Sequence, residues 1–171
     1  MNNFGNVNYQ ALATIIKPFG LFGEVYLKPV SRYFEQYINC SDLSLSHGSA
    51  TRYPIKITSI KASGKKKIFK LEGFNSRVEV QKIVGYTIFV KVPIGDKINQ
   101  ISKDLIGWEV ISISKIYIGK LIDIMWCPSN DVYIVKNDDK EYLIPVVDSF
   151  VKEINYNQKQ IIIKPIDGLV E

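Results

Sequence analysis

The sequence predicts an all-β protein built from two small units in tandem. Short strand-like runs rich in Ile, Val, Tyr and Phe follow one another along most of the chain. Turn residues separate these runs, and only two segments carry helix signals. A stretch rich in Pro, Gly, Asp and Asn, residues 93–100, interrupts the series. Because closure of a sheet removes exposed edge strands, many short strands with little helix favour a barrel before this break, and a second all-β unit follows it.

Composition narrows the class of protein. The 171 residues are 46% hydrophobic, which is ample for a buried core. No run of about 18 apolar residues suggests a membrane span, and the first nine residues lack the features of a secretory signal. We therefore expect a soluble, cytoplasmic protein. The two cysteines, Cys40 and Cys127, are far apart in sequence, and we expect both to be reduced and buried.

Charge is distributed unequally along the chain. Residues 1–95 contain thirteen Lys and Arg against five Asp and Glu, a net charge of +8. Residues 96–171 contain nine against twelve, a net charge of −3, and the two halves sum to the +5 of the whole chain. This asymmetry predicts an anionic partner for the first half and a neutral or basic partner for the second.

The first two strands are expected over residues 12–16 and 24–27, joined by a turn that begins at Lys17 and contains Gly20 and Gly23. Two compatible interpretations apply to the glycines. In the first, positive φ angles or close backbone approach require both glycines, as in a bulged hairpin. Alternatively, the flattened backbone presents N–H groups to a phosphate or a partner, with Lys17, Phe19 and Phe22 as contact surface.

The rest of the first half alternates strands with two helices. A short helix is predicted after Ser31, which would cap it, and a second over residues 76–84. In the second, Ser76 and Glu79 have the spacing of a capping box. Strands are expected over residues 42–45, 53–60, 68–71 and 87–92. The most basic spot is a hairpin tip formed by Lys65, Lys66 and Lys67.

The second half contains six strand-like runs separated by turn residues such as Pro128 and Asn137. They cover residues 108–113, 119–126, 131–136, 141–147, 151–156 and 160–165.

Residues for catalysis or metal binding are scarce. The one histidine, His47, precedes a glycine in a predicted turn, where a solvated side chain is expected. Neither cysteine has the spacing of a zinc site, and no glycine-rich phosphate loop of the P-loop or dinucleotide type occurs. The GxxG spacing of Gly20 and Gly23 is that of KH domains, but the KH loop joins two helices. Strands are expected on both sides of this loop, so we reject that match. Aromatic residues such as Tyr26 occur on alternating β spacing. At such positions an aromatic side chain is more often part of the core than a platform for base stacking.

Four stretches, in this order and spacing, resemble the RimM family of bacterial ribosome maturation factors. The first is Gly20 to Glu24, and the second is Leu71 to Gly85, with Glu72, Gly73, Arg77 and Glu79. The third comprises Asp104, Leu105, Ile106, Gly107, Val110, Gly119, Lys120, Asp123, Ser129, Asn130, Asp131 and Val132. The fourth comprises Leu143, Ile144, Pro145, Phe150 and Val151, with Gly168 and Leu169 near the end.

The resemblance implies an N-terminal six-stranded barrel over residues 1–93, similar to barrels of translation factors and flavin reductases. A linker over residues 94–100 and a C-terminal PRC-barrel over residues 101–171 would follow. It also implies a non-enzymatic monomer without cofactor or membrane contact. Such a protein assists 16S rRNA processing by binding the immature small subunit at its head. The implied partners are the small-subunit precursor, a basic ribosomal protein of the head and ribosomal RNA.

Candidate contact residues come from these motifs and from the charge pattern. In the first half, expected to contact RNA, they are Lys17, Phe19, Gly20, Phe22, Gly23, Glu24, Lys65, Lys66, Lys67 and Arg77. In the second half, expected to dock on protein, they are Asp104, Leu105, Gly107, Asp123, Asn130, Asp131 and Pro145. The three aspartates could hold basic side chains of the partner, or serve only as turn and cap residues.

The sequence departs from the family pattern in two places. Phe19 stands where the family usually has His, so a contact through that His cannot be carried over. Gln100, Ile101 and Ser102 replace neighbouring aromatics, which implies a different or weaker docking there.

Three other functions compete with a ribosome assembly factor. The N-terminal barrel alone would suit a flavin-dependent reductase, which should purify with a coloured flavin. A PRC-barrel alone would suit a membrane-associated electron-transfer module, for which the sequence offers no anchor. A two-barrel adaptor with another partner also fits the sequence.

Overall fold

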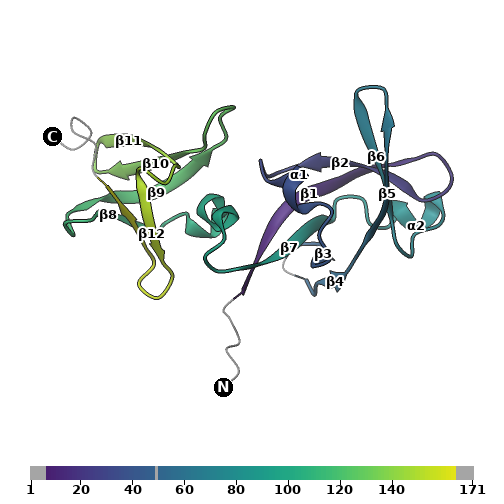
Figure 1. Cartoon of the computed structure of the whole chain (residues 1–171), viewed down its shortest axis with the longest axis horizontal. Coiled ribbons are helices and arrows are strands. Elements are labelled where there is room, and N and C mark those ends of the chain that lie inside the picture. Colours follow the sequence, from purple (N-terminus) through teal and green to yellow (C-terminus); the bar gives the residue numbers. More distant parts are fainter. Residues whose placement is uncertain (1–6, 49, 165–171) are drawn as a thin grey trace, which may run out of the picture. The chain divides into compact units, whose positions relative to one another are not determined.

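The structure is a computed structural model that describes residues 7–48 and 50–164. It divides into two compact units, residues 1–96 and 97–171, and each is built on its own β-sheet (Figure 1). The all-β class and the two tandem barrels expected from the sequence are confirmed.

The described residues of the first unit form seven strands in one sheet. They are β1 (Val7–Phe19), β2 (Glu24–Pro29), β3 (Leu43–Ser46), β4 (Tyr53–Pro54), β5 (Ile57–Ser63), β6 (Lys66–Leu71) and β7 (Thr87–Pro93). Their order in the sheet is β4-β3-β7-β1-β2-β6-β5. All but the two-residue β4 are at least four residues long, which leaves the six substantial strands that the barrel was expected to have.

The sheet of the first unit curls because its two edge strands, β4 and β5, are consecutive in the chain. Only Ile55 and Lys56 separate them. The N–H of Ile55 donates to the carbonyl of Leu43, and the N–H of Glu72 donates to the carbonyl of Lys56. These two residues therefore link the edges beside β3 and β6, which is how a barrel removes open edges.

The core of the first unit is formed by the inward side chains of the strands and is completed by two short helices, α1 (Phe34–Tyr37) and α2 (Arg77–Gln81). Phe34 of α1 packs edge to face on Phe69, with ring centroids 5.8 Å apart. Val80 of α2 is fully buried. Because each helix has one buried face and one exposed face, α2 can hold polar side chains at the surface.

The two helix starts differ in how well the sequence predicted them. At α2, Ser76 is the N-cap and forms the expected capping box with Glu79. At α1, the N-cap is Tyr33 rather than Ser31, and Tyr33 makes no side-chain cap. The Ser31 hydroxyl instead accepts from the Tyr33 N–H at 3.1 Å. The predicted cap therefore stabilises the turn that leads into the helix.

The second unit begins with two short 3₁₀ helices, η1 (Lys97–Ile101) and η2 (Lys103–Leu105). Its strands are β8 (Glu109–Ser112), β9 (Tyr117–Met125), β10 (Val132–Asn137), β11 (Lys140–Pro145), β12 (Val151–Asn155) and β13 (Gln160–Ile163). The sheet order is β11-β10-β9-β8-β13-β12, with β13 and β8 parallel. Its edge strands, β11 and β12, are again consecutive in the chain, so this sheet curls in the same manner.

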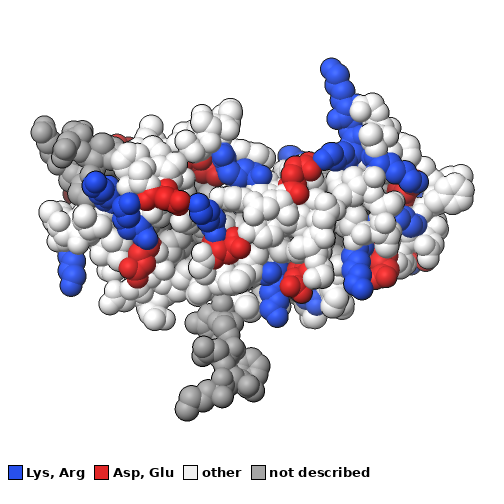
Figure 2. Space-filling view, in the orientation of Figure 1, with Lys and Arg blue, Asp and Glu red and all other residues white. Residues whose placement is uncertain are grey.

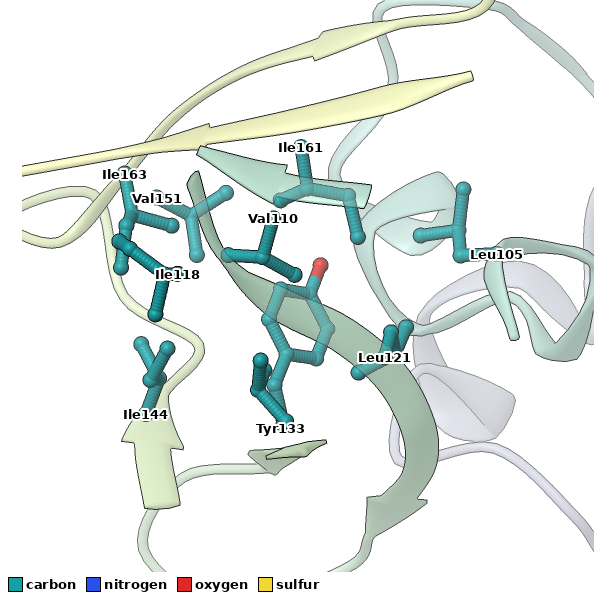
Figure 3. Packing of buried hydrophobic residues seen from close by; sticks show 10 residues of the cluster. Leu105, Val110, Ile118, Leu121, Tyr133, Ile144, Val151, Ile161 and Ile163 are labelled. Atoms are coloured by element: carbon teal, nitrogen blue, oxygen red, sulfur yellow. The ribbon is translucent and has the colours of Figure 1, made fainter. Parts of the chain in front are cut away.

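Tyr133 lies at the centre of the second core, fully buried among Val110, Leu121 and Ile118 (Figure 3). Its hydroxyl donates to the carbonyl oxygen of Gln100 at 2.5 Å. A buried phenol needs such an acceptor, and this one comes from η1. The bond therefore fixes η1 to the barrel that follows it.

Several local expectations are corrected. Lys17 and Phe19 belong to β1, because the ladder with β2 continues to the pair Phe19–Glu24. The strand expected over residues 53–60 is broken, since Ile55 turns into the core between β4 and β5. Both cysteines are free but only half-buried. η1 begins inside the segment predicted as a linker, residues 94–100, and its Ile98 and Asn99 are buried, while the domain bounds themselves stay a prediction. Pro165, Gly168 and Leu169 lie outside the described residues.

Candidate functional site

The turn between β1 and β2 has backbone conformations at its two ends that favour glycine. Gly20 and Gly23 have φ angles of +58° and +77°. At Gly23 the backbone also approaches Phe74, and an added β-carbon would lie 2.2 Å from the Phe74 carbonyl oxygen. The positive φ angles and the close approach expected for these glycines are therefore both present.

Cationic side chains hold the carbonyl groups of this turn. The Arg77 guanidinium donates to the carbonyl of Gly20 at 3.4 Å, and the backbone N–H of Arg77 donates to the carbonyl of Leu21 at 3.1 Å. The ammonium of Lys70 donates to the carbonyls of Phe22 and Phe74. The turn is thus tied to the start of α2 and to β6, and Arg77 is a residue that positions it.

The side chains of the turn point outward because its backbone is held inward. Leu21 and Phe22 are 70% and 74% exposed, and Val78 on α2 is 70% exposed. Phe22 is therefore available as contact surface, as the sequence predicted. Val78 was missed, because a short amphipathic helix gives little warning of an exposed valine on its outer face.

The most basic feature of the first unit is a groove, here called the basic groove, lined by Lys17, Lys28, Lys65, Lys66 and Lys67. Its volume is about 390 Å³. The lysines come from β1, β2 and the β5–β6 hairpin, so residues nearly fifty positions apart in sequence meet there. Lys side chains extend along that projecting hairpin in Figure 2. The structure thus brings together the four lysines predicted as contacts, Lys17, Lys65, Lys66 and Lys67, and adds Lys28 to them.

Tyr26 forms part of the wall of the basic groove and organises two of its cations. The ammonium groups of Lys17 and Lys66 lie 5.3 and 5.7 Å from the centre of its ring, within the range of a cation–π contact. Phe19 packs edge to face on the same ring at 5.5 Å. Phe19 therefore supports Tyr26 more than it offers a contact surface of its own.

A β-bulge places Lys17 at the surface. In a regular strand residues two apart share a face, so Lys17 would follow the fully buried Ile15 into the core. The register of β1 against β2 shifts between these two residues, and both Ile16 and Lys17 are exposed. Bulges of this kind turn a side chain to the other face of a strand.

Two carboxylates moderate the positive charge nearby. Glu35 lines the basic groove and pairs with Lys67 at 2.6 Å. Glu24, also a candidate contact residue, is largely covered and pairs with Lys61 at 3.0 Å. The strongest unneutralised charge in the groove therefore lies at Lys17, Lys28, Lys65 and Lys66.

In the second unit, the outer face of β9, β10 and β11 forms a mainly apolar surface, here called the outer face. Cross-strand pairing sets Asp123, Ile134 and Leu143 in one row. A second row consists of Met125, Val132 and Pro145. Directly paired residues share a face of the sheet, and the alternating residues Tyr133, Val135 and Ile144 are in the core. Leu143 is 51% exposed and Met125 is 40% exposed.

The predicted docking residues of the second unit separate into three groups. Asp123 and Pro145 lie on the outer face, and Asn130 is exposed just before β10. Asp104 is exposed in η2, and Gly107 is exposed just after it, where its N–H donates to the carbonyl of Leu121 on β9 at 2.7 Å. Leu105 and Asp131 are buried, so their side chains are not available to a partner. The apolar residues of the outer face were not predicted as contacts, although their alternation with core residues could have identified them.

The described part of the chain contains no cluster of three His, Cys, Asp or Glu side chains able to hold a metal ion. None of its helices is long and apolar enough to cross a membrane. His47 is exposed in a turn beside Tyr86, as expected.

Comparison with known proteins gives consistent matches along the chain. The family model described as the RimM N-terminal domain matches residues 11–93, and that of the RimM PRC barrel domain matches residues 102–169. The ribosome maturation factor RimM of Clostridioides difficile is 29% identical over 161 residues, covering 92% of this chain and 93% of the relative. That of Petrotoga mobilis is 29% identical over 177 residues, covering 98% and 95%. A crystal structure of a RimM protein from Pseudomonas aeruginosa is 20% identical, covers 94% of this chain and 99% of its own, and has a TM-score of 0.45.

Proposed function

Because this chain belongs to the RimM family, we propose that it is a ribosome maturation factor that assists 16S rRNA processing and assembly of the small subunit. Its target is the immature small subunit, contacted at the head through ribosomal RNA and a basic ribosomal protein. It acts in the cytoplasm as a binding protein, and we assign it no catalytic step. The two barrels divide the work, the first binding RNA and the second binding protein.

The observation that carries the RNA contact is the basic groove. Five lysines from β1, β2 and the β5–β6 hairpin line it, two of them beside the Tyr26 ring, and among the described lining residues Glu35 is the only carboxylate. Phosphate groups of RNA are the partner that such a surface fits, because lysines release counterions from the nucleic acid when they neutralise its phosphates. The volume of about 390 Å³ is large enough for a nucleotide-sized group, and Tyr26 offers a ring beside it.

The exposed side chains of Leu21, Phe22 and Val78 give the first barrel an apolar contact beside its basic one. Exposed apolar groups at a rigid turn lose little conformational freedom when they bind, because the turn is already held by Arg77 and Lys70. We assign this turn to packing against the ribosomal surface next to the RNA contact.

The outer face of the second barrel is assigned to the protein partner. Its centre is apolar, which matches the core of a protein interface, and Asp123 supplies one negative charge within it. Residues 96–171 carry a net charge of −3, so a basic ribosomal protein is electrostatically favoured. Asn130, just before β10, and Pro145, at the end of β11, extend this surface.

The experiment is sedimentation of the tagged full chain in a cell lysate that contains both precursor and mature small subunits. We expect the chain to travel with precursor subunits and to be depleted from mature ones. Two variants then separate the contacts: Lys65→Gln with Lys66→Gln for the groove, and Leu143→Asp for the outer face. Both should reduce the bound fraction. A chain that sediments alone, or equally with mature subunits, contradicts the proposal.

A further inference from the structure

A second cavity in the first barrel lies on the outer side of β1, β3, β4 and β7 and is separate from the basic groove. It is lined by Tyr9, Ser41, Asp42, Ser44, Arg52 and Lys91, among others, and its volume is about 200 Å³. Pockets for drug-sized ligands usually span about 300–1,000 Å³. This cavity therefore fits a small ion, or one group of a larger molecule.

Arg52 is held over the cavity by two aromatic rings. The central carbon of its guanidinium lies 4.7 Å from the centre of the Tyr9 ring and 4.8 Å from that of Phe89. Cation–π contacts fix the position of the group but occupy none of its five N–H donors in ordinary hydrogen bonds. Within the described residues Arg52 makes no hydrogen bond or ion pair, so these donors remain for an acceptor.

Ser44 supplies an unusual buried group at the same place. Its neighbours Leu43 and Leu45 lie in the core, so alternation along β3 turns Ser44 to the opposite side, where it lines the cavity. The residue is only 7% exposed, and its Oγ has no hydrogen-bond partner among the described residues. A buried hydroxyl without a partner destabilises the fold, and such groups call for an explanation.

The strand register gathers these residues on one face. Ser44 pairs with Phe89 on β7 and with Pro54 on β4, while Tyr9 pairs with Lys91. Arg52, which contacts both rings, therefore lies over the row that contains Ser44. Lys91 adds a second cation, and Asp42 is the one carboxylate in the lining. The lining carries a net positive charge.

We propose that this cavity is a phosphate-binding site. The Arg52 fork, the Lys91 ammonium and the hydroxyls of Ser44 and Ser41 offer donors from β3, from β7 and from the segments before β3 and β4. Donors from several directions suit the oxygens of a tetrahedral phosphate better than the two of a carboxylate. Binding gives the Ser44 hydroxyl the acceptor that the protein itself does not provide. The inference rests on this geometry alone and holds whether or not the basic groove binds RNA.

The test is a titration of the isotopically labelled full chain with inorganic phosphate, followed by NMR. We expect saturable shifts at Ser44, Arg52 and Lys91. Arg52→Gln should weaken binding by about tenfold or more, since a charge-assisted hydrogen bond is lost. Ser44→Ala should also weaken binding, yet leave the melting temperature unchanged or raised, because it removes an unsatisfied buried hydroxyl. The matched control is Lys56→Gln, which removes one exposed charge from the same barrel outside both sites.

Further ligands distinguish the source of the phosphate. Ribose 5-phosphate presents a monoester, whereas a dinucleoside monophosphate presents the diester of an RNA backbone. Binding of the diester as tightly as the free ion would support an RNA backbone contact, and binding of monoesters alone would support a terminal phosphate. Equal binding of acetate would overturn the choice of phosphate. Shifts that persist in Arg52→Gln but vanish when Lys65 and Lys66 are replaced would assign the phosphate to the basic groove and overturn the site.

Discussion

Gly23 lies so close to Phe74 that a β-carbon on the glycine would be 2.2 Å from the Phe74 carbonyl oxygen. Gly20, at the other end of the same turn, also has a positive φ angle, but its β-carbon would meet only the Glu24 carboxylate at 3.8 Å. The two glycines therefore have different roles. Gly20 permits a backbone conformation, whereas Gly23 permits both a conformation and a backbone contact.

Alanine at these two positions should separate those roles. Gly20→Ala should cost about 1–2 kcal/mol of unfolding free energy, the usual cost of a left-handed conformation. Gly23→Ala should cost about 1–3 kcal/mol more, because the backbone of Phe74 must shift. Urea denaturation of both variants measures the difference. Equal losses would show that the close approach to Phe74 does not constrain the turn.

The capping box at α2 gives a second prediction. The Ser76 hydroxyl accepts from the Glu79 N–H at 3.3 Å. Ser76→Ala removes this acceptor and should cost about 0.5–2 kcal/mol of stability. Ser76→Thr keeps the acceptor oxygen and serves as the matched control. An unchanged denaturation midpoint for Ser76→Ala would contradict the role of the cap.

The other half of the capping box predicts a dependence on pH. The Glu79 carboxylate accepts from the N–H of Asn75 at 2.7 Å and from the hydroxyl and N–H of Ser76. These bonds, that from Asn75 first, lower the pKa of Glu79 below its ordinary value. A lowered pKa means that ionised Glu79 stabilises the fold above the ordinary carboxyl pKa, and that this contribution is lost as pH falls through the lower folded value.

Glu79→Gln tests this sign. Glutamine keeps the shape of the capping box but carries no charge. Its stability relative to the unsubstituted chain should be lowest at neutral pH, and the two proteins should converge in acid. Urea denaturation at several pH values measures the difference, with Glu153→Gln on β12 as an exposed control. A difference that grows as pH falls would contradict the assignment.

The sequence predicted the architecture well because each element carries a local signal. Alternation located most strands to within a few residues, and the Ser76–Glu79 spacing located α2. The failures have a common cause in tertiary structure. Ile55 breaks a strand because the sheet closes there, and Ser31 is not the N-cap because α1 begins at Phe34, with Tyr33 in the N-cap position. Neither feature can be predicted from a short window of sequence.

The candidate sites were only partly predictable for the same reason. The cluster Lys65 to Lys67 is visible in sequence, and its meeting with Lys17 and Lys28 could be expected only from the order of β1, β2 and β6. The bulge at Ile16 that exposes Lys17 carries no clear sequence signal. On the outer face, the six surface residues come from three strands, and only their register shows that they are neighbours.

The basic groove predicts how RNA binding responds to salt. Log affinity falls linearly with log salt concentration. Each neutralised phosphate adds about 0.9 to the steepness of this slope on a duplex and about 0.7 on a single strand. Lys65→Gln with Lys66→Gln should weaken binding of small-subunit RNA and lower this slope by about one to two. The measurement is a fluorescence titration at several salt concentrations.

A matched pair of lysines outside the groove controls for total charge. Lys56→Gln with Lys82→Gln removes the same net charge from the same barrel. If RNA binding depended only on the overall charge of the first half, the slope of log affinity against log salt would decrease by the same amount in both double variants. That result would remove the reason to assign RNA to the groove.

The last prediction concerns the protein partner and the outer face. Leu143 pairs with Ile134, which pairs in turn with Asp123, so an exposed leucine and a carboxylate lie at opposite ends of one row across three strands. Apolar contact at the centre of an interface depends little on salt, whereas charge contact at the rim is screened. Leu143→Asp should therefore weaken capture of a basic protein of the small-subunit head at low and high salt alike. Asp123→Asn should weaken it mainly at low salt.

Ile113→Asp, at a site 55% exposed on the same barrel but outside these rows, is the control for an added charge. Pull-down of isolated head proteins by the full chain at two salt concentrations provides the measurement. If Ile113→Asp reduced capture as much as Leu143→Asp, or if Leu143→Asp impaired RNA binding instead, the outer face would not be the protein-docking surface.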